Sequence, residues 1–234
     1  FRVIALDHLG CGLSDKPQDP NLYTLKNHID HLEELVDGLE IDEFSLVVHD
    51  WGGAIGCGLA TRRPQKLKAL SLHNTAAFTS SHIPLRINLL RSALGEKAIH
   101  AFNAFAWPAT FMAVKKPLAG TVKEGYLAPY NSYQNRIATA RFVRDIPMKK
   151  NHPSYSTLLE IEKKLPLLEA PKLFQWGMKD FCFNKYFLNR WKIIFLNYEL
   201  ETYPEAGHYL LEDANGPARR RLRDFFIRHL GPNS

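Results

Sequence analysis

Short runs of β-branched and other apolar residues alternate along the chain with stretches in which apolar residues recur every three or four positions. The short runs are typical of strands, and the longer spacing is typical of amphipathic helices. The predicted strands cover 2–6, 44–49, 68–73, 172–176 and 199–203. Between the first two, TLKNHIDHLEELVDGLE predicts a helix behind a Thr24 N-cap, with an apolar face of Leu25, Ile29, Leu32, Val36 and Leu39. This alternation predicts an α/β fold with a mostly parallel sheet flanked by helices.

The strand pattern stops between about residues 78 and 166, where the chain predicts several helices. This segment is rich in aromatic residues, namely Phe102, Phe105, Trp107, Phe111, Tyr126, Tyr130 and Tyr133. Because strand patterns resume after it, an inserted helical cap explains the segment better than a second independent domain. We therefore expect a core formed by 1–77 and 167–234 and a cap formed by 78–166, which suits a chain of 234 residues.

Composition and charge exclude several classes of protein. Hydrophobic residues make up 45% and charged residues 23%, with no run of eighteen apolar residues, so we expect a soluble protein without a membrane span. The net charge is +6, but the one dense basic cluster, Arg219 to Arg221 with Arg223, fits a solvated helix face better than a nucleic-acid site. Cys11, Cys57 and Cys182 are too far apart for a CxxC pair and odd in number, which fits a reducing cytoplasm.

The stretch LVVHDWGGAIG, residues 46–56, places an acid on a sharp corner between a strand and a helix. This is the frame of a nucleophile elbow, with Asp50 in the position usually held by serine and Gly52 and Gly53 allowing close packing. The turn would aim the backbone N–H of Trp51 at the reacting centre, beside the positive end of the helix. The alternative interpretation is that Asp50 is only an N-cap before a tight turn.

A carboxylate nucleophile forms an ester with its substrate, and hydrolysis of that ester needs a histidine base oriented by another acid. In hydrolases of this type the order along the chain is nucleophile, acid, histidine. His208 follows the last predicted strand on a glycine turn in YPEAGHYLLED. Two strand ends offer an acid position: Asn74 in HNTAAF cannot carry the charge, so Asp180 in QWGMKD is the better candidate, although a simple turn aspartate is the alternative.

Two further motifs could suggest a cofactor site or a metal site, but neither fits, so we expect no cofactor and no metal. DHLGCGLSDKP places Asp15 where a dinucleotide loop needs its third glycine, so we interpret 7–17 as a structural loop beneath the active site. His28 and His31 are three apart on a helix but lack further ligands, and are most simply surface residues.

The motifs HDWGG, DHLGCGLSDKP, WGMKD and AGHYLLED together resemble the haloalkane dehalogenase and epoxide hydrolase branch of the α/β-hydrolase superfamily, over essentially the whole chain. More closely, NTAAF, FNAFA, YLAPYNSYQNRIATARFVRDIP and GHYLLEDA resemble the dehalogenase-like β-lactone decarboxylases of bacterial long-chain olefin biosynthesis. The resemblance implies that Asp50 is the nucleophile, Trp51 the donor at the leaving group, Asp180 the orienting acid and His208 the base. It also implies a small hydrophobic substrate with two long alkyl chains, and other olefin-biosynthesis enzymes as candidate partners.

A roofed apolar cavity between the cap and Asp50, lined by several cap aromatics, would suit such a substrate. One departure concerns the N-terminus. The family has a His-Gly loop before the strand that matches 2–6, and the strand preceding that loop lies between those matching 2–6 and 44–49. Neither is found in this chain, which opens on Phe1. We therefore expect an N-terminally incomplete sheet with a gap or an unpaired edge beside 44–49.

Three alternatives to β-lactone decarboxylation remain. The first is a haloalkane dehalogenase. The second is an epoxide hydrolase, which would need two cap tyrosines at the epoxide oxygen, from among Tyr126, Tyr130, Tyr133 and Tyr155. The third is a non-catalytic binding protein that retains the hydrolase fold.

Overall fold

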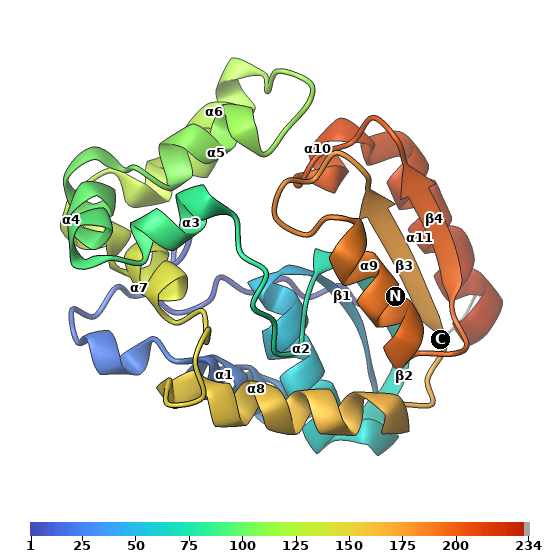
Figure 1. Cartoon of the computed structure of the whole chain (residues 1–234). Coiled ribbons are helices and arrows are strands. Elements are labelled where there is room, and N and C mark those ends of the chain that lie inside the picture. Colours follow the sequence, from blue (N-terminus) through green and yellow to red (C-terminus); the bar gives the residue numbers. More distant parts are fainter. Residues whose placement is uncertain (232–234) are drawn as a thin grey trace.

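The computed structural model describes residues 1–231, which fold around a four-stranded parallel sheet (Figure 1). The strands are β1 (Phe44–Asp50), β2 (Leu67–Thr75), β3 (Lys172–Gly177) and β4 (Glu199–Tyr203), in the order β1-β2-β3-β4. Their register pairs Val48 with Leu72, Leu72 with Phe174, and Phe174 with Leu200. Four of the five predicted strands and the parallel α/β architecture are therefore confirmed.

Eleven α-helices are found in the described residues. They are α1 (Leu25–Gly38), α2 (Trp51–Arg62), α3 (Leu85–Leu90), α4 (Ala93–Phe102), α5 (Ala106–Met112), α6 (Gly120–Leu127), α7 (Ile137–Arg144), α8 (Pro153–Lys164), α9 (Lys185–Ile194), α10 (Leu210–Asp213) and α11 (Asn215–Leu230). Single 3-10 turns lie at Pro20–Leu22, Pro64–Lys66, Ala128–Tyr130, Gln134–Arg136 and Leu165–Leu167. The predicted helical character of 78–166 is confirmed.

Alternation along the strands assigns each side chain to one of two faces of the sheet. Leu70, Leu72 and Phe174 join the large apolar cluster that also contains residues of α1, α2, α8 and α9. Ala69 and Leu173 point the other way and pack on Phe225 of α11. Helix α11 therefore covers this second face at β2 and β3, whereas Val47 of β1 on the same face is 45% exposed.

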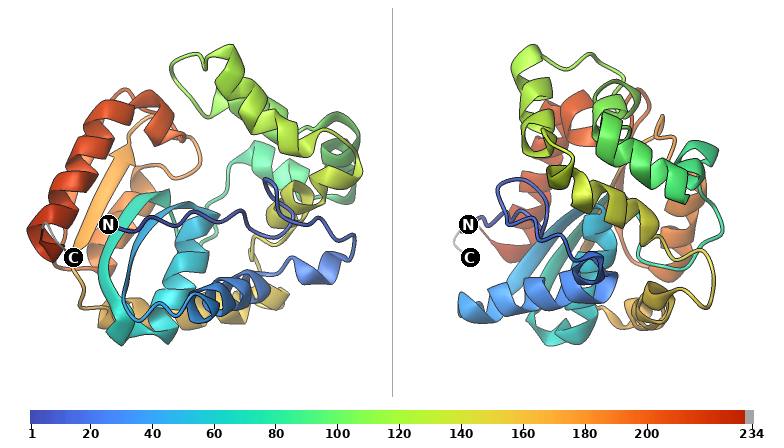
Figure 2. Two further views of the ribbon diagram at one scale, coloured as in Figure 1. Left: turned by 180° about the vertical axis from the view of Figure 1, so that it is seen from behind. Right: turned by 90° about the vertical axis from the view of Figure 1, so that its left-hand side faces the viewer.

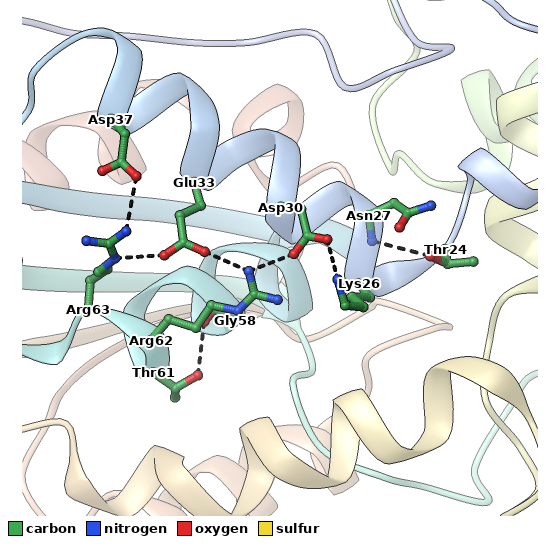
Figure 3. A network of polar contacts seen from close by, with 10 residues as sticks. All are labelled: Thr24, Lys26, Asn27, Asp30, Glu33, Asp37, Gly58, Thr61, Arg62 and Arg63. Carbon is green, nitrogen blue, oxygen red and sulfur yellow. Dashed lines mark hydrogen bonds and ion pairs between the residues drawn. The ribbon is translucent and has the colours of Figure 1, made fainter.

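The first helix forms where its spacing predicts, and a charged network fixes it to α2. Thr24 caps α1 by accepting a hydrogen bond from the Asn27 N–H, as predicted. Arg62, at the end of α2, and the following Arg63 reach three acids of α1, with Glu33 bound by both arginines at 2.7 Å (Figure 3). Exposed ion pairs contribute at most about 1 kcal/mol each, so the network sets the orientation of α1 more than its stability.

Helices α3 to α7 form a separate group beside the core (Figure 1). Two ring contacts place this group at the carboxyl ends of the strands: Tyr126 of α6 stacks on Tyr209, and Phe142 of α7 packs on Trp51. Helix α8 instead returns to pack on α1 and α2. The loop at 7–17 lies between α1 and the α3–α7 group, where Gly10, with φ +80°, packs against Tyr23 and Ala138.

The strand expected at 2–6 is wrong. The segment is extended but pairs with no strand, and Val3 is 87% exposed. Figure 2 shows it running past the sheet towards the α3–α7 group, while Phe1 rests on Phe226 of α11. An apolar run becomes a strand only where a neighbouring edge takes up its N–H and C=O groups, and 2–6 does not follow such an edge. Within residues 1–231, β1 is therefore an edge strand, which fits the expected unpaired edge.

The expected surface position of His28 is also wrong. His28 is 1% exposed, and its ring stacks on Phe142 of α7 at 4.4 Å between centroids. Burial lowers the pKa of His28 to about 3, and the neighbouring His8 and His31 act in the same direction. The helix is covered by α7 on this side as well as by the sheet on its apolar stripe, and helical periodicity alone does not reveal that second contact. His31 is partly buried. In the basic cluster of α11, Arg219, Arg220 and Arg223 are exposed as expected, whereas Arg221 is partly buried and pairs with Glu199.

Candidate active site

Asp50 occupies the sharp corner between β1 and α2. Its backbone lies at φ +50° and ψ −127°, a conformation that costs a non-glycine residue roughly 1–3 kcal/mol. Gly53 allows α2 to pack closely against the end of β2, because a Cβ at this position would lie 1.8 Å from the Thr75 hydroxyl oxygen. The same hydroxyl donates a 2.5 Å hydrogen bond to the backbone carbonyl of Asp50. The corner leaves 40% of the Asp50 side chain accessible.

His208 reaches Asp50 from the loop that follows β4, and Asp180 reaches His208 from the loop that follows β3. The Nδ1 atom of His208 lies 2.9 Å from Oδ2 of Asp180, and Nε2 lies 3.4 Å from Oδ1 of Asp50. Both His208 and Asp180 are buried. Asp180 Oδ1 also accepts a 2.6 Å bond from the Cys182 N–H, which fixes the carboxylate relative to its own loop. The structure thus brings together the three residues that the sequence analysis selected.

The electrostatics of the three residues favour an ionised Asp50. Burial alone would lower the pKa of His208, but its bonds to Asp180 and then to Asp50 outweigh burial and raise that pKa to about 10. Burial would raise the pKa of Asp50, but His208 and the Trp51 N–H hold it below its usual range. At neutral pH the site therefore holds a carboxylate beside an imidazolium.

Trp51, the fourth selected residue, is partly buried directly after Asp50. Its indole packs at 5.3 Å on Phe142, so it lies between the corner and α7. A carboxylate with a histidine and a second carboxylate in line behind it is the arrangement of a covalent catalyst.

Residues 1–215 match the sequence profile of the α/β hydrolase fold family. The chain belongs to this family. It is 43% identical to a cis-3-alkyl-4-alkyloxetan-2-one decarboxylase of Shewanella oneidensis, over 96% of this chain and 73% of that protein. It is 37% identical to an enzyme of the same name from Xanthomonas campestris pv. campestris, over 98% of this chain and 80% of that one. Among solved structures, haloalkane dehalogenase DbeA from Bradyrhizobium elkani superposes with a TM-score of 0.88 at 24% identity, covering 96% and 80% of the two chains.

These comparisons confirm the predicted α/β-hydrolase fold and the resemblance to its dehalogenase-like and β-lactone decarboxylase members. They also bear out the expectation of an enzyme. No helix in residues 1–231 is long and apolar enough to cross a membrane. Within the same residues, no group of three or more histidine, cysteine or acidic side chains is arranged to hold a metal ion.

Sequence reasoning missed a residue that shapes this hydrolase site. Asn74, considered only as a possible acid, is fully buried at the end of β2. Its Oδ1 accepts a 2.7 Å bond from the Gly177 N–H, and its Nδ2 donates to the Gly177 carbonyl at 3.1 Å. It therefore ties the end of β2 to the start of the loop that carries Asp180. Its position at a strand end could have indicated this role, because the carboxyl ends of neighbouring parallel strands meet at one edge of the sheet.

His49, the residue before Asp50, was also missed. Its Nε2 lies 2.9 Å from the backbone oxygen of His208, and burial lowers its pKa to about 4. It lines a cavity of about 150 Å³, which also involves Tyr126, Tyr209 and Glu212. A second hollow of about 440 Å³ lies at the start of α11. Asp50 lines neither, and Phe102, Trp107 and Phe111 are exposed, so the apolar cavity between the cap and Asp50 stays a prediction.

Proposed function

We propose that this hydrolase-fold enzyme decarboxylates a long-chain β-lactone to an alkene, with Asp50 as nucleophile. The observation that supports this most directly is the accessible Asp50 carboxylate on a strained corner, paired with His208, in a chain 43% identical to an oxetanone decarboxylase. In this proposal Asp180 orients His208, and Trp51 donates hydrogen bonds near the reacting atoms.

The first step is the opening of the four-membered ring. A carboxylate oxygen of Asp50 attacks the ring carbon that bears the ring oxygen, and that carbon–oxygen bond breaks. The ring oxygen leaves as part of a new carboxylate, so one negative charge moves from Asp50 to the substrate. The product is an alkyl ester on Asp50 that carries a β-carboxylate. Release of ring strain and the ionised state of Asp50 both favour this step.

The second step regenerates the enzyme without water. The β-carboxylate leaves as carbon dioxide, and the electron pair of its carbon–carbon bond forms the double bond. The ester carbon–oxygen bond breaks at the same time and returns its pair to Asp50. A carboxylate suits both steps, since it is a nucleophile in the first and a leaving group in the second.

In this decarboxylation His208 is not needed as a base for water, unlike the histidine of a dehalogenase. Esterification removes the charge of Asp50, which is one of the two anions that raise the pKa of His208. The pKa of His208 should therefore fall in the ester. The imidazolium then gives its proton to solvent and becomes a neutral imidazole able to activate water. A dehalogenase needs that water to release its product, whereas the decarboxylation above does not. Dehalogenation is the second candidate function because the same three residues support it.

The structure gives less support to an epoxide hydrolase. The Tyr126 hydroxyl donates to Glu212 at 2.8 Å, and Tyr133 is exposed with its ring stacked on His100. Tyr130 interacts with Cys11 of the 7–17 loop. Three of the four candidate tyrosines thus hold other partners, and Tyr155 alone cannot supply a pair, so two hydroxyls at an epoxide oxygen would need rearrangement. A non-catalytic binding role would leave the strained corner and the paired histidine without a use.

One experiment separates these functions. The purified protein is offered a long-chain cis-β-lactone, a bromoalkane and an epoxide, and the products alkene, bromide and diol are measured. The proposal predicts alkene from the lactone as the fastest reaction. Bromide or diol as the fastest product would replace it with the corresponding alternative. No product and no covalent adduct on Asp50 from any of the three would favour a binding protein.

The remaining expectations complete the proposal. The core of 1–77 and 167–234 carries the chemistry, and the cap of 78–166 covers the alkyl chains, with its last helix α8 resting on α1 and α2. Three unpaired cysteines support a reducing cytoplasm. Other enzymes of olefin biosynthesis are the expected partners, which co-purification from a producing cell would test.

A further inference from the structure

The segment 113–116, the first part of the link between α5 and α6, touches the turn that carries His208. The Tyr209 N–H donates a 2.9 Å hydrogen bond to the Ala113 carbonyl, so this contact lies immediately after His208. Immediately before it, a Cβ on Gly207 would lie 2.8 Å from the same carbonyl, which is closer than real side chains approach. The cap and the turn are therefore packed backbone to backbone on both sides of His208.

Asp213, at the end of α10, bonds to both partners of this junction. Its Oδ1 accepts 2.9 Å bonds from the N–H groups of Lys115 and Lys116, and its Oδ2 accepts a 2.7 Å bond from the Gly207 N–H. The Lys116 ammonium group adds a 2.9 Å bond to the Asp213 carbonyl. The side chain is buried, at 5% exposure. Loss of the carboxylate would leave the buried Gly207 N–H and the partly buried N–H groups of Lys115 and Lys116 without an acceptor.

We propose that Asp213 is a positioning residue that holds the cap segment 113–116 and the base His208 in one fixed arrangement. The inference rests on the proposed role of Asp50 as nucleophile, and it concerns the water step of the second candidate function, which uses His208 as a base. His208 must keep its short bond to Asp180 while its other nitrogen faces Asp50. Gly207 precedes it directly, so a shift of the 113–116 segment is transmitted to the imidazole. The cap and the base thus move as a unit.

The variant Asp213→Asn tests this idea with little change of shape. The amide keeps one acceptor oxygen but puts an NH₂ group against either Gly207 or the two lysine N–H groups. In single-turnover reactions with a bromoalkane, we expect ester formation on Asp50 at close to the wild-type rate, since that step needs no base. Water attack on the ester should slow by roughly 10- to 100-fold, the cost of a displacement of about 1 Å at a catalytic group.

Asp145→Asn is the matched control. Asp145 is also a buried acid, and it accepts 2.7 Å bonds from the Leu25 N–H and the Ser154 hydroxyl. It ties the end of α7 to α1 and α8, so it fastens the cap at a different place without contacting the three site residues. If Asp213 were merely structural, both variants would lose stability and neither would accumulate the ester. We expect accumulation only in the Asp213 variant.

Hydrogen exchange gives a readout that needs no activity. We expect faster exchange in 113–116 and 207–213 together in Asp213→Asn, and not in Asp145→Asn. Unchanged exchange there, or ester resolution as fast as in the control, overturns the inference. If the wild-type protein forms neither an ester with any electrophile nor alkene from a β-lactone, the proposed function fails, and the exchange data still decide the junction. Should Asp213→Asn not fold, Asp213→Glu keeps the charge but misplaces it, and the same two measurements apply.

Discussion

Replacement of His208 by glutamine separates decarboxylation from hydrolysis, because only hydrolysis needs a base for water. Glutamine keeps a hydrogen-bonding side chain of moderate size but cannot take a proton. The bond from Nδ1 to Asp180 and the contact of Nε2 with Asp50, now 3.4 Å, would both be lost or weakened. Asp50 itself stays in place, since its corner is fixed by Gly53 and Thr75.

The expected loss of rate depends on whether another group can replace His208 as the base. General base catalysis by a positioned histidine contributes roughly 10²- to 10⁴-fold, or about 3–5 kcal/mol of barrier. His49 is the nearest other imidazole, but its Nε2 lies against the His208 carbonyl and burial lowers its pKa to about 4. It is not free to serve as a substitute. Water attack on the Asp50 ester should therefore slow by the full factor, while alkene formation from a β-lactone should fall by about tenfold or less, because only the electrostatic support of Asp50 is lost.

Intact-protein mass spectrometry and product analysis read both outcomes. With a bromoalkane, the variant should release about one equivalent of bromide and gain the mass of the alkyl group. With a β-lactone, it should continue to release alkene over many turnovers. Loss of alkene by the same factor as bromide, in a variant with native circular dichroism, would mean that His208 also takes part in decarboxylation, and the two mechanisms could not be separated in this way.

The remaining predictions concern the nucleophile, the corner and a buried histidine. Asp50→Asn keeps the size but removes the attacking charge, so alkene, bromide and adduct should all fall to background in parallel assays. Gly53→Ala should destabilise the fold by about 1–3 kcal/mol in urea titration, since its methyl group would overlap the Thr75 hydroxyl, whereas Gly52→Ala, with no neighbour closer than 4.0 Å, should have little effect. Buried His28 has a folded pKa of about 3, below its unfolded value, so its share of stability is present above pH 6.5 and is lost as the pH falls towards 3. His28→Phe should remove up to about 1.4 kcal/mol per pH unit of that acid dependence, and identical slopes of unfolding free energy against pH in both proteins would contradict the burial argument.

The sequence predicts the parts of this fold that depend on local spacing. The α1 face, the Thr24 cap and strands β1 to β4 each follow from periodicity within a few residues. The segment 2–6 has the same apolar character as β1 but forms no strand, because pairing depends on a neighbour that local sequence does not specify. His28 fails for the same reason, since its burial comes from Phe142, more than a hundred residues away.

The candidate site was predictable for a different reason, namely that each of its residues lies at the end of a strand or in the loop that follows one. Parallel strands bring their carboxyl ends to one edge, so order along the chain was enough to select Asp50, Asp180 and His208. The order of residues along the chain does not reveal which other residues hold these three in place. Asn74 joins β2 to the Asp180 loop, and Asp213 joins the cap to the His208 turn, through bonds to backbone groups that leave no pattern in the sequence.

The two kinds of support explain why the corner and the base should respond differently to mutation. The corner at Asp50 is built within one β–α unit and its neighbour β2, with Gly53 against Thr75 and a hydroxyl on the strained carbonyl, so it persists as long as the core folds. The base is held by loops, through Asp180 on one side and Gly207 and Asp213 on the other. Loops open at lower free energy than the core does, so perturbations of the cap should reach His208 long before they reach Asp50. A reaction that needs only the corner would therefore tolerate changes in the cap that a reaction needing the base would not.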